Sequence, residues 1–406
     1  MLQTVLSRPL DVRSDDYERV LAKMQNLVVD WLDQLAGGDL PCFEDQSGAG
    51  EEDEDSVGES DAESSGEAHV DTARRTVVKR LLLPTVGAGE SEIAKSMNAC
   101  LSYTSILCVL SFSMRLLETR KTATQREIYY TYVKHFANQT KCNEAILDCA
   151  TLLGEPRHCL GIVASSRGYL AGRISIRGEG FEEWQDPRST GGTSGLAITS
   201  DWLTRPLELK SDARYVVVVE KDGVFNRMVE DGFYDRQNLN ISTYSSWIPS
   251  VLVTGQGFPP LAVRACVHRL TAALDLPVLG LVDCNPFGLS VFLQYKGGSS
   301  RQGKGSAKYK VPDMQWVGLR PSQLDDLDLP EEVHQKLSQQ DLARAQSVSN
   351  SSLVSDNPET YGEEVAYWLD TDNPGSKVEL EALYTLGMDA LTGRFLETAV
   401  LREDYI

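Results

Sequence analysis

Four short runs of almost uninterrupted apolar residues in the second half of this 406-residue chain constrain its fold more than any other feature. The runs lie at Tyr215–Val219, 250–253, 278–282 and 316–319. Segments with helical periodicity, such as Leu261–Leu274, separate them. Strands that are apolar on both faces need cover on both faces, which is typical of a parallel sheet flanked by helices. The sequence therefore predicts an α/β domain with a Rossmann-like parallel sheet over 206–406, including a C-terminal helix at 377–398.

Residues 76–176 have a different pattern, in which helical periodicity is followed by two strands. Three segments have apolar residues at helical spacing, and Thr124 provides a capping signal for one of them. Two strands, 158–164 and 169–176, are separated by a turn that ends in Gly168. Three helices and a two-stranded wing predict a winged-helix domain, so the chain as a whole is predicted to be a multidomain α/β protein. Winged helices commonly bind DNA, but they also serve as protein-docking modules.

Composition sets the other domain boundaries. Residues 1–43 form a predicted helical extension whose amphipathic helix, 16–35, must dock on the protein itself or on a partner. Residues 44–75 are rich in Glu, Asp, Ser and Gly, which predicts a disordered acidic linker. Five glycines between positions 178 and 195 predict a second linker over 177–205.

The distribution of charge matters more than its sum. The formal net charge is −20, but twelve acidic residues lie in 44–71, so the rest of the chain carries −8. Segment 296–310 has five basic residues and no acidic one. Basic surfaces of this kind are compatible with a DNA partner, although the total charge gives no support for one. No stretch approaches the ~18 to 20 apolar residues of a membrane span, so we expect no membrane partner.

Segment 126–136 combines a helical pattern with a tyrosine outside the apolar stripe. At ~100° per residue, one face of a helix carries Ile128, Tyr129, Tyr132, Val133 and Phe136. Tyr130 lies outside this face, and its neighbours at four-residue spacing are Arg126 and Lys134. A surface phenol between two cations is a candidate nucleophile for a phosphodiester. The alternatives are a surface tyrosine without a role, or Tyr129 as the nucleophile.

Acidic residues follow two of the predicted parallel strands. Glu220 ends the first strand, and Asp283 and Asn285 follow another. Ligands bind at the carboxyl ends of strands in open parallel sheets, so we expect these three side chains to converge. Mg²⁺ takes one or two carboxylates and completes its shell with water and phosphate oxygens. The alternative is that the two acids cap helices or pair with lysines.

Several short motifs occur in an order that resembles one family. They are the helix with Arg126, Tyr129 and Tyr130, then segments 160–168, 219–222, 254–259 and 283–288. Over roughly residues 90–320 the chain resembles the A subunit of DNA topoisomerase VI and its eukaryotic relative, the meiotic double-strand-break transesterase. The Asp-x-Asn form of the last motif and the acidic extension favour the meiotic member. Gln256 stands where a lysine is usual, and Pro260 where an aspartate is usual.

The resemblance implies a reaction and a set of partners. Tyr130 matches the nucleophile that cuts DNA through a covalent 5′-phosphotyrosyl intermediate, and Glu220, Asp283 and Asn285 match the Mg²⁺ ligands of a toprim domain. Cutting both strands requires two tyrosines, so we expect a homodimer on double-stranded DNA. The resemblance also implies accessory break-formation proteins, a topoisomerase VI B-like subunit and a location in the nucleus.

Basic residues near these motifs are candidates for phosphate contacts. Arg126 is expected to hold the scissile phosphate, since a guanidinium matches two phosphate oxygens. Further candidates are Lys134, Arg167, Arg173, Lys304 and Lys308, and the alternative is that these are ordinary solvated cations. Three other functions stay open: a topoisomerase VI-type protein working with a separate ATPase, a metal-dependent nuclease that uses water, and a non-catalytic DNA-binding paralogue.

Overall fold

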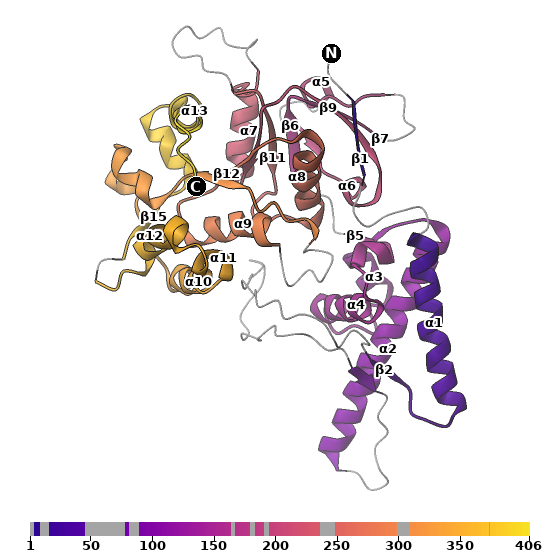
Figure 1. The fold of residues 1–406 in the computed structure, drawn as a ribbon. Coiled ribbons are helices and arrows are strands. Elements are labelled where there is room, and N and C mark those ends of the chain that lie inside the picture. The colour runs from indigo at the N-terminus through magenta and orange to yellow at the C-terminus, as the bar shows by residue number, and fades with distance from the viewer. Residues whose placement is uncertain are drawn as a thin grey trace.

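The described residues form a helical body and a sheet-bearing body, which lie side by side in Figure 1. The computed structural model describes residues 4–8, 16–44, 78–80, 89–163, 167–178, 183–190, 195–235, 248–298, 308–372 and 374–406. Apart from its first residue, the linker predicted at 44–75 lies outside this described part, and so does Lys304.

Four helices make up the helical body. They are α1 (Asp16–Ala36), α2 (Glu90–Thr119), α3 (Gln125–Thr131) and α4 (Gln139–Leu153). A 3₁₀ turn, η1 (Arg157–Leu160), and two small sheets complete it: β2 (Cys42–Glu44) with β3 (Val78–Arg80), and β4 (Ala123–Thr124) with β5 (Ile162–Val163). Ile106, Ile128 and Ile146 come from α2, α3 and α4 and are fully buried in one core.

The amphipathic helix α1 docks on the chain's own helical body. Val20 and Met24 are fully buried against that body. Arg19 and Lys23, which lie on the same part of the helix, pair with the buried carboxylate of Glu155 just after α4. The structure thus settles the choice between docking on the protein and docking on a partner for this face of α1.

Helix α2 is long and apolar enough to cross a membrane if length and composition alone are considered, and it is the one such helix among the described residues. Its buried positions include Tyr103, Val109 and Leu117. These side chains belong to the same core as those of α1 and α4. Packing within the helical body therefore accounts for the apolar composition of α2.

The predicted parallel sheet is confirmed. Its strands are β10 (Tyr215–Val219), β11 (Ser250–Thr254), β12 (Val278–Leu281) and β13 (Gln315–Gly318). They are parallel to one another in the order β13-β12-β10-β11. Between them in sequence lie the helices α7 (Asp222–Glu230), α8 (Leu261–Leu274) and α9 (Pro286–Gly297). The strands are rich in buried apolar residues, as the sequence predicted for a covered sheet.

The hairpin predicted over 158–164 and 169–176 is wrong. β5 pairs in parallel with β4, whereas β6 (Tyr169–Gly172) is antiparallel to β11 in the large sheet, whose last strand is β8 (Leu196–Ala197). Leu170 and Ala171 are each 1% exposed, so β6 gains more burial at the apolar sheet than a two-stranded wing could provide.

A second sheet joins the N-terminus to the sheet-bearing body. β7 (Ile174–Gly178) and β1 (Val5–Ser7) flank β9 (Leu207–Ser211), and both are antiparallel to it. Short helices α5 (Pro187–Thr190) and α6 (Asp201–Thr204) lie within the range predicted as a linker, 177–205. The strand β1 is visible beside β7 and β9 in Figure 1. The exact domain boundaries stay predictions, although 169–178 pairs with strands beyond 206.

The C-terminal region is built from short elements. They are η5 (Pro321–Asp326), η6 (Glu331–Val333), β14 (Gln335–Lys336), α10 (Gln339–Ser349), α11 (Ser352–Ser355), α12 (Pro358–Leu369), β15 (Ser376–Lys377), η7 (Leu380–Leu386), a π-helical turn η8 (Ala390–Leu396) and α13 (Glu397–Leu401). The single helix predicted at 377–398 is wrong. Gly387 has φ of 131°, a value outside the helical region, and separates η7 from η8.

Candidate active site

Tyr130 lies on the short helix α3, which is stabilised by a capping residue at its start and by a buried side chain on its inner face. The Thr124 hydroxyl accepts a hydrogen bond from the Glu127 backbone N–H at 3.3 Å, which caps α3. Ile128 is fully buried, whereas Tyr130 is 67% exposed. The predicted exposure of Tyr130 is therefore confirmed, and its hydroxyl lies within reach of an incoming ligand.

The helix is shorter than the pattern indicated. α3 ends at Thr131, and residues 132–135 form a turn. Arg126 keeps its place one helical turn before Tyr130 and is exposed, but Lys134 lies in the turn and not at helical spacing. Val133, predicted to be in the apolar stripe, is 48% exposed because the helical phase does not extend to it.

An aromatic ring lies beside Tyr130, and one cation that the sequence analysis did not select, Arg115, lies beside Tyr132. The ring of Tyr129 is half-buried, and its centroid lies 5.3 Å from that of Tyr130. The Arg115 guanidinium donates to the Tyr132 hydroxyl at 3.3 Å, from α2. Arg115 thus brings another positive charge to the neighbourhood of α3, and no sequence signal linked it to this segment.

Glu220 and Asp283 converge at the carboxyl ends of β10 and β12, as predicted. The Asp283 backbone N–H donates to Glu220 Oε2 at 2.9 Å. Burial raises the pKa of Glu220, and the nearby Asp283 carboxylate raises it further. Burial also raises the pKa of Asp283, which is 3% exposed. Their proximity and burial therefore disfavour the ionised forms of both carboxyl groups.

Asn285 has a structural role at this edge of the sheet. Its Oδ1 accepts a hydrogen bond from the Gly288 N–H at 2.7 Å and caps α9. The helix-capping alternative considered for the two acids thus applies to Asn285 instead. Its capping bond fixes the side chain beside Asp283.

Lys221 pairs with Asp283, so the alternative that the acids pair with lysines holds for Asp283, although the sequence analysis did not name this lysine. Its Nζ lies 3.1 Å from Asp283 Oδ2, 3.0 Å from Glu379 Oε2 and 2.8 Å from Glu381 Oε2. Burial alone would lower the pKa of Lys221, but these carboxylates outweigh burial and raise it. The backbone N–H of Leu380 donates to Asp283 Oδ1 at 2.8 Å. Both Asp283 oxygens are therefore oriented by other groups.

The acidic pair fits a divalent cation. Within the described ranges, no three His, Cys, Asp or Glu side chains form a group suited to a metal, so the fit rests on Glu220 and Asp283. Burial raises the pKa of both acids even though Lys221 contacts Asp283, so a bound cation would favour their charged forms. Two carboxylates suit a divalent cation that completes its shell with water and phosphate oxygens.

The cations predicted to contact DNA have different surroundings. Arg167 is exposed, and its guanidinium donates to the Gln256 backbone oxygen at 2.9 Å. Arg173 pairs with Asp212 and, at 3.5 Å, with Asp235. Lys308 is exposed. The two carboxylates occupy the Arg173 guanidinium, which gives this residue a structural role.

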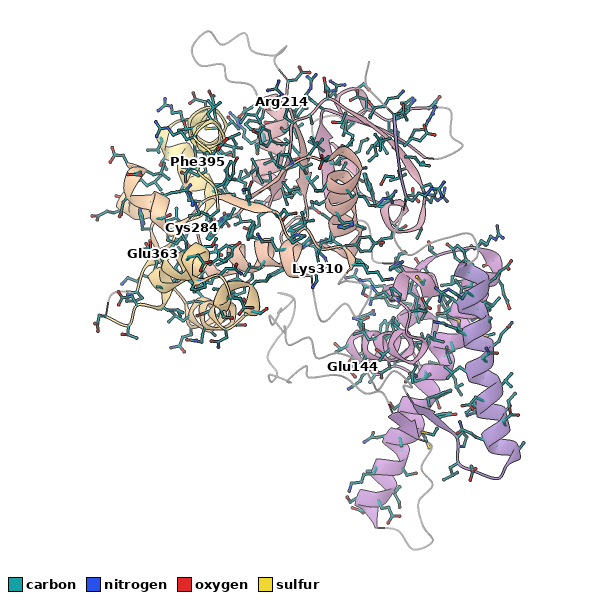
Figure 2. All side chains as sticks on the ribbon, viewed as in Figure 1. Glu144, Arg214, Cys284, Lys310, Glu363 and Phe395 are labelled. Atoms are coloured by element: carbon teal, nitrogen blue, oxygen red, sulfur yellow. The ribbon has the colours of Figure 1, made fainter. Side chains whose placement is uncertain are left out.

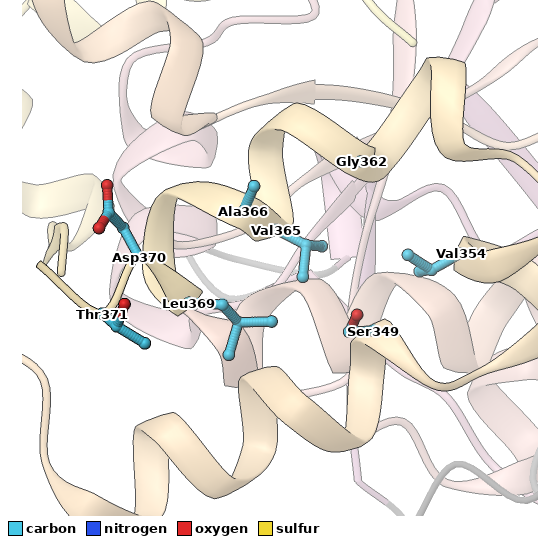
Figure 3. A pocket seen from close by; sticks show the side chains of 8 residues that line it. All are labelled: Ser349, Val354, Gly362, Val365, Ala366, Leu369, Asp370 and Thr371. Carbon is cyan, nitrogen blue, oxygen red and sulfur yellow. The ribbon is translucent and has the colours of Figure 1, made fainter.

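A groove of about 490 Å³ lies among α10, α11 and α12, away from these residues. Its lining is formed by Ser349, Val354, Gly362, Val365, Ala366, Leu369, Asp370 and Thr371 (Figure 3). None of the predicted site residues lines it. The groove is therefore separate from the exposed tyrosine and from the acidic strand ends.

Together, a toprim-type sheet with acids at its strand ends and a helical body with an exposed tyrosine define a topoisomerase-like protein. Residues 215–400 match the toprim domain of the family formed by Spo11 and the topoisomerase 6 A subunit, while residues 102–162 match the family "Type IIB DNA topoisomerase". The chain belongs to this family of Spo11 proteins and topoisomerase 6 A subunits. The resemblance found in the motifs is thereby confirmed.

Individual relatives include meiotic proteins and topoisomerase subunits. The chain is 36% identical over 316 residues to "Meiotic recombination protein SPO11-2" of Oryza sativa subsp. japonica, covering 76% of both chains. It is 31% identical to the DNA topoisomerase 6 A subunit of Arabidopsis thaliana, covering 70% of this chain and 62% of the relative. It is 30% identical to "Meiotic recombination protein SPO11" of Mus musculus, covering 72% and 69%.

Proposed function

We propose that the protein is a DNA-cleaving transesterase that makes double-strand breaks through a covalent 5′-phosphotyrosyl intermediate and thereby initiates meiotic recombination. The observation that carries this proposal is the 67% exposure of Tyr130 within a segment that matches the type IIB topoisomerase family. A buried tyrosine at this position could not reach DNA.

In the proposed reaction, one ester replaces another. The Tyr130 hydroxyl oxygen attacks the phosphorus of a phosphodiester, so a bond to the phenol forms as the bond to the 3′ oxygen breaks. The phenolic proton passes to the leaving oxygen, which becomes a 3′-hydroxyl. Because the exchange conserves a phosphodiester, cutting itself needs no nucleotide cofactor. Arg126, one helical turn away and exposed, binds two phosphate oxygens and neutralises their charge.

Glu220 and Asp283, with Asn285 beside them, would hold Mg²⁺. When bound, the ion supplies positive charge that orients the DNA backbone and stabilises charge near the 3′ oxygen. The hydrogen bond from the Asp283 N–H holds Glu220 in place, and the bond from the Leu380 N–H holds Asp283. These contacts orient the carboxylates before any ligand binds.

Two copies of the chain are needed to cut both strands. We propose a homodimer in which Tyr130 of one protomer meets the acidic pair of the other. The main contacts of α3 within the chain are with β4 and α4, which leaves Tyr130 available to a second copy. Mixing Tyr130→Phe chains with Glu220→Ala chains should then restore cleavage of one strand only. A mixture that cuts no strand, as expected if each site lies within one chain, or that cuts both strands would contradict the shared site.

The DNA is proposed to lie along α3, with Arg126, Lys134, Arg167 and Lys308 as phosphate contacts and Lys304 as a further candidate. In this proposal the helical body acts as a winged-helix-type DNA-binding module, without the hairpin that the sequence analysis expected. Each true contact that is removed should reduce the salt dependence of binding by roughly 0.9 in slope. If a substitution leaves the salt dependence of DNA binding unchanged, the substituted residue does not contact a phosphate.

The meiotic role and the topoisomerase role share this chemistry. The similarity to the topoisomerase 6 protein of Arabidopsis thaliana favours, as a second candidate, a protein that relaxes or decatenates DNA together with a separate ATPase. In either role we propose a topoisomerase VI B-like partner, and in the meiotic role also accessory break-formation proteins and a location in the nucleus. Mapping protein–DNA adducts in meiotic and in dividing cells separates the two.

The chemistry itself is tested with two neighbouring tyrosines. Tyr130→Phe should abolish covalent protein–DNA adducts, whereas Tyr129→Phe, a matched control on the same helix, should retain them. Adducts are measured by denaturing electrophoresis of end-labelled DNA after nuclease trimming. Adducts formed by the Tyr130→Phe protein would refute the assignment. DNA cleavage without any adduct in the wild-type protein would favour a nuclease that uses water.

A further inference from the structure

The C-terminal segment that follows β15 is bound directly to the loop that carries Asp283. Cys284 and Val378 exchange two backbone hydrogen bonds, of 2.9 and 3.0 Å, as an isolated antiparallel bridge. The Leu380 N–H donates to Asp283 Oδ1 two residues later. Cys284 is labelled in Figure 2, where the C-terminal elements meet the sheet-bearing body. The segment thus forms one wall of the acidic site.

The same segment places two further carboxylates around Lys221. Glu379 and Glu381 lie on either side of Leu380, and both bind the Lys221 ammonium. Their side chains are 47% and 42% exposed, whereas the side chain of Asp283, which also binds the ammonium, is 5% exposed. The Lys221 ammonium is therefore shared between one buried carboxylate and two exposed ones.

This sharing has a consequence for any cation at Glu220 and Asp283. The Lys221 ammonium lies 3.1 Å from Asp283 Oδ2, so it competes with a divalent cation for that oxygen and repels the cation. Glu379 and Glu381 offset its charge and draw it toward the protein surface. Their removal would leave Asp283 as the one remaining carboxylate among the three that bind Lys221.

We propose that Glu379 and Glu381 are positioning residues for the metal site, because by holding Lys221 they set how strongly it competes with a divalent cation for Asp283. The inference deepens the proposed function, since it rests on the magnesium site suggested for Glu220 and Asp283. It assigns the C-terminal segment a role in metal affinity in addition to its packing.

The competing explanation is that the ion pairs of Lys221 only stabilise the fold, by joining the C-terminal segment to the loop of Asp283. The two explanations differ in sign for Lys221→Met. Under the charge-sharing proposal, this change removes the competitor and leaves Glu379 and Glu381 unneutralised, so Mg²⁺ binds at least as tightly as in the parent. Under the competing explanation, the same change loosens the site and weakens binding.

The experiment is a calorimetric titration with Mg²⁺ of the full chain carrying Tyr130→Phe, which prevents cutting. Glu379→Gln/Glu381→Gln should weaken Mg²⁺ binding by roughly 10- to 100-fold, the usual effect of losing partners outside the ligand shell. Adding Lys221→Met to this pair should restore most of the affinity. Glu359→Gln/Glu363→Gln is the matched control, because it removes the same charge from exposed positions on α12.

The outcomes separate the two proposals. Unchanged affinity in Glu379→Gln/Glu381→Gln, equal weakening in the control pair, or a failure of Lys221→Met to restore binding overturns the charge-sharing proposal. Asp283→Asn should abolish Mg²⁺ binding, and retained binding would place the ion elsewhere and overturn the magnesium site as well. Adduct formation by Tyr130 is assayed separately in the wild-type chain. A failure to form adducts would refute the transesterase proposal without changing the conclusion from the Mg²⁺ titration.

Discussion

Glu220→Gln should stabilise the protein in the absence of divalent cations. Glu220 is placed beside Asp283 at the end of β10, where burial first, and then repulsion by Asp283, raise its pKa. A glutamine has nearly the same shape, and its side-chain oxygen can still accept the 2.9 Å hydrogen bond from the Asp283 N–H. The substitution therefore removes a carboxyl whose ionisation is opposed by folding, and keeps the favourable contact.

The size and the pH dependence of the effect follow from the raised pKa. One unit of pKa shift corresponds to about 1.4 kcal/mol, and we expect a gain of about 1 to 3 kcal/mol at pH 7. Because the folded-state pKa of Glu220 lies above its unfolded value of ~4.3, the wild-type protein loses stability as the pH rises above that value. The gain from Glu220→Gln should accordingly be present at neutral pH and vanish near pH 4.

The assay is thermal unfolding in a chelating buffer at several pH values. A gain of this size raises the midpoint by roughly 2 to 4 °C per kcal/mol for a body of about 200 residues. Glu230→Gln on α7, whose side chain is 54% exposed, is the control and should change stability by less than about 0.5 kcal/mol. A Glu220→Gln protein that is less stable than wild type at pH 7, or shifted equally at pH 4 and 7, would refute the reasoning.

Three further predictions concern the elements that hold the site. Thr124→Ala removes the cap of α3 and should cost about 1 kcal/mol in urea unfolding, while Thr124→Ser should cost less. Gly168→Ala should reduce the yield of folded protein sharply on gel filtration, because a Cβ at φ of +88° would lie 2.4 Å from the Thr254 backbone oxygen. Glu155→Gln should increase limited proteolysis of α1. Although burial opposes it, the cationic partners on α1 lower the Glu155 pKa, so the wild-type contact is lost as the pH falls below ~4.3.

Local sequence was sufficient where burial alone decides the structure. The strand at Tyr215–Val219 is apolar at all five positions, and four of them are buried, so its place in a covered sheet could be predicted without knowing its neighbours. The helix Leu261–Leu274 was likewise predicted at its observed bounds. In both, the pattern of apolar residues and the tertiary packing favour the same structure.

Local sequence was insufficient where pairing connects distant residues. The strand Tyr169–Gly172 has the composition of a hairpin strand, but Ala171 pairs with Leu252, some eighty positions later. The role of Lys221 could not be predicted for the same reason, since its partners Glu379 and Glu381 are 158 and 160 residues away. Neither contact leaves a periodic signal in a single sequence.

The tyrosine helix lies between these two cases. The phase of its first turn is fixed by the Thr124 cap, which is a local signal, and this was enough to predict that Ile128 is buried and Tyr130 exposed. Its end at Thr131 was missed because no glycine or proline marks a stop in 126–136. The position of Lys134 relative to Tyr130 depended on that end and was therefore predicted wrongly.

The proposed active site has two parts, the acidic pair and Tyr130, and one chain orients the first part more fully than the second. The acidic pair is already oriented by Lys221, Leu380 and the Asp283 backbone. Tyr130 is on a capped helix and is directed to solvent. A cation bound to the oriented acidic pair would still need further oxygen ligands, which a DNA phosphate can supply. The exposed Tyr130 phenol needs a DNA phosphate placed next to it before it can react. DNA that lies across two protomers would satisfy both needs at once, which is why the pairing of Tyr130→Phe with Glu220→Ala chains is the decisive test of the assembly.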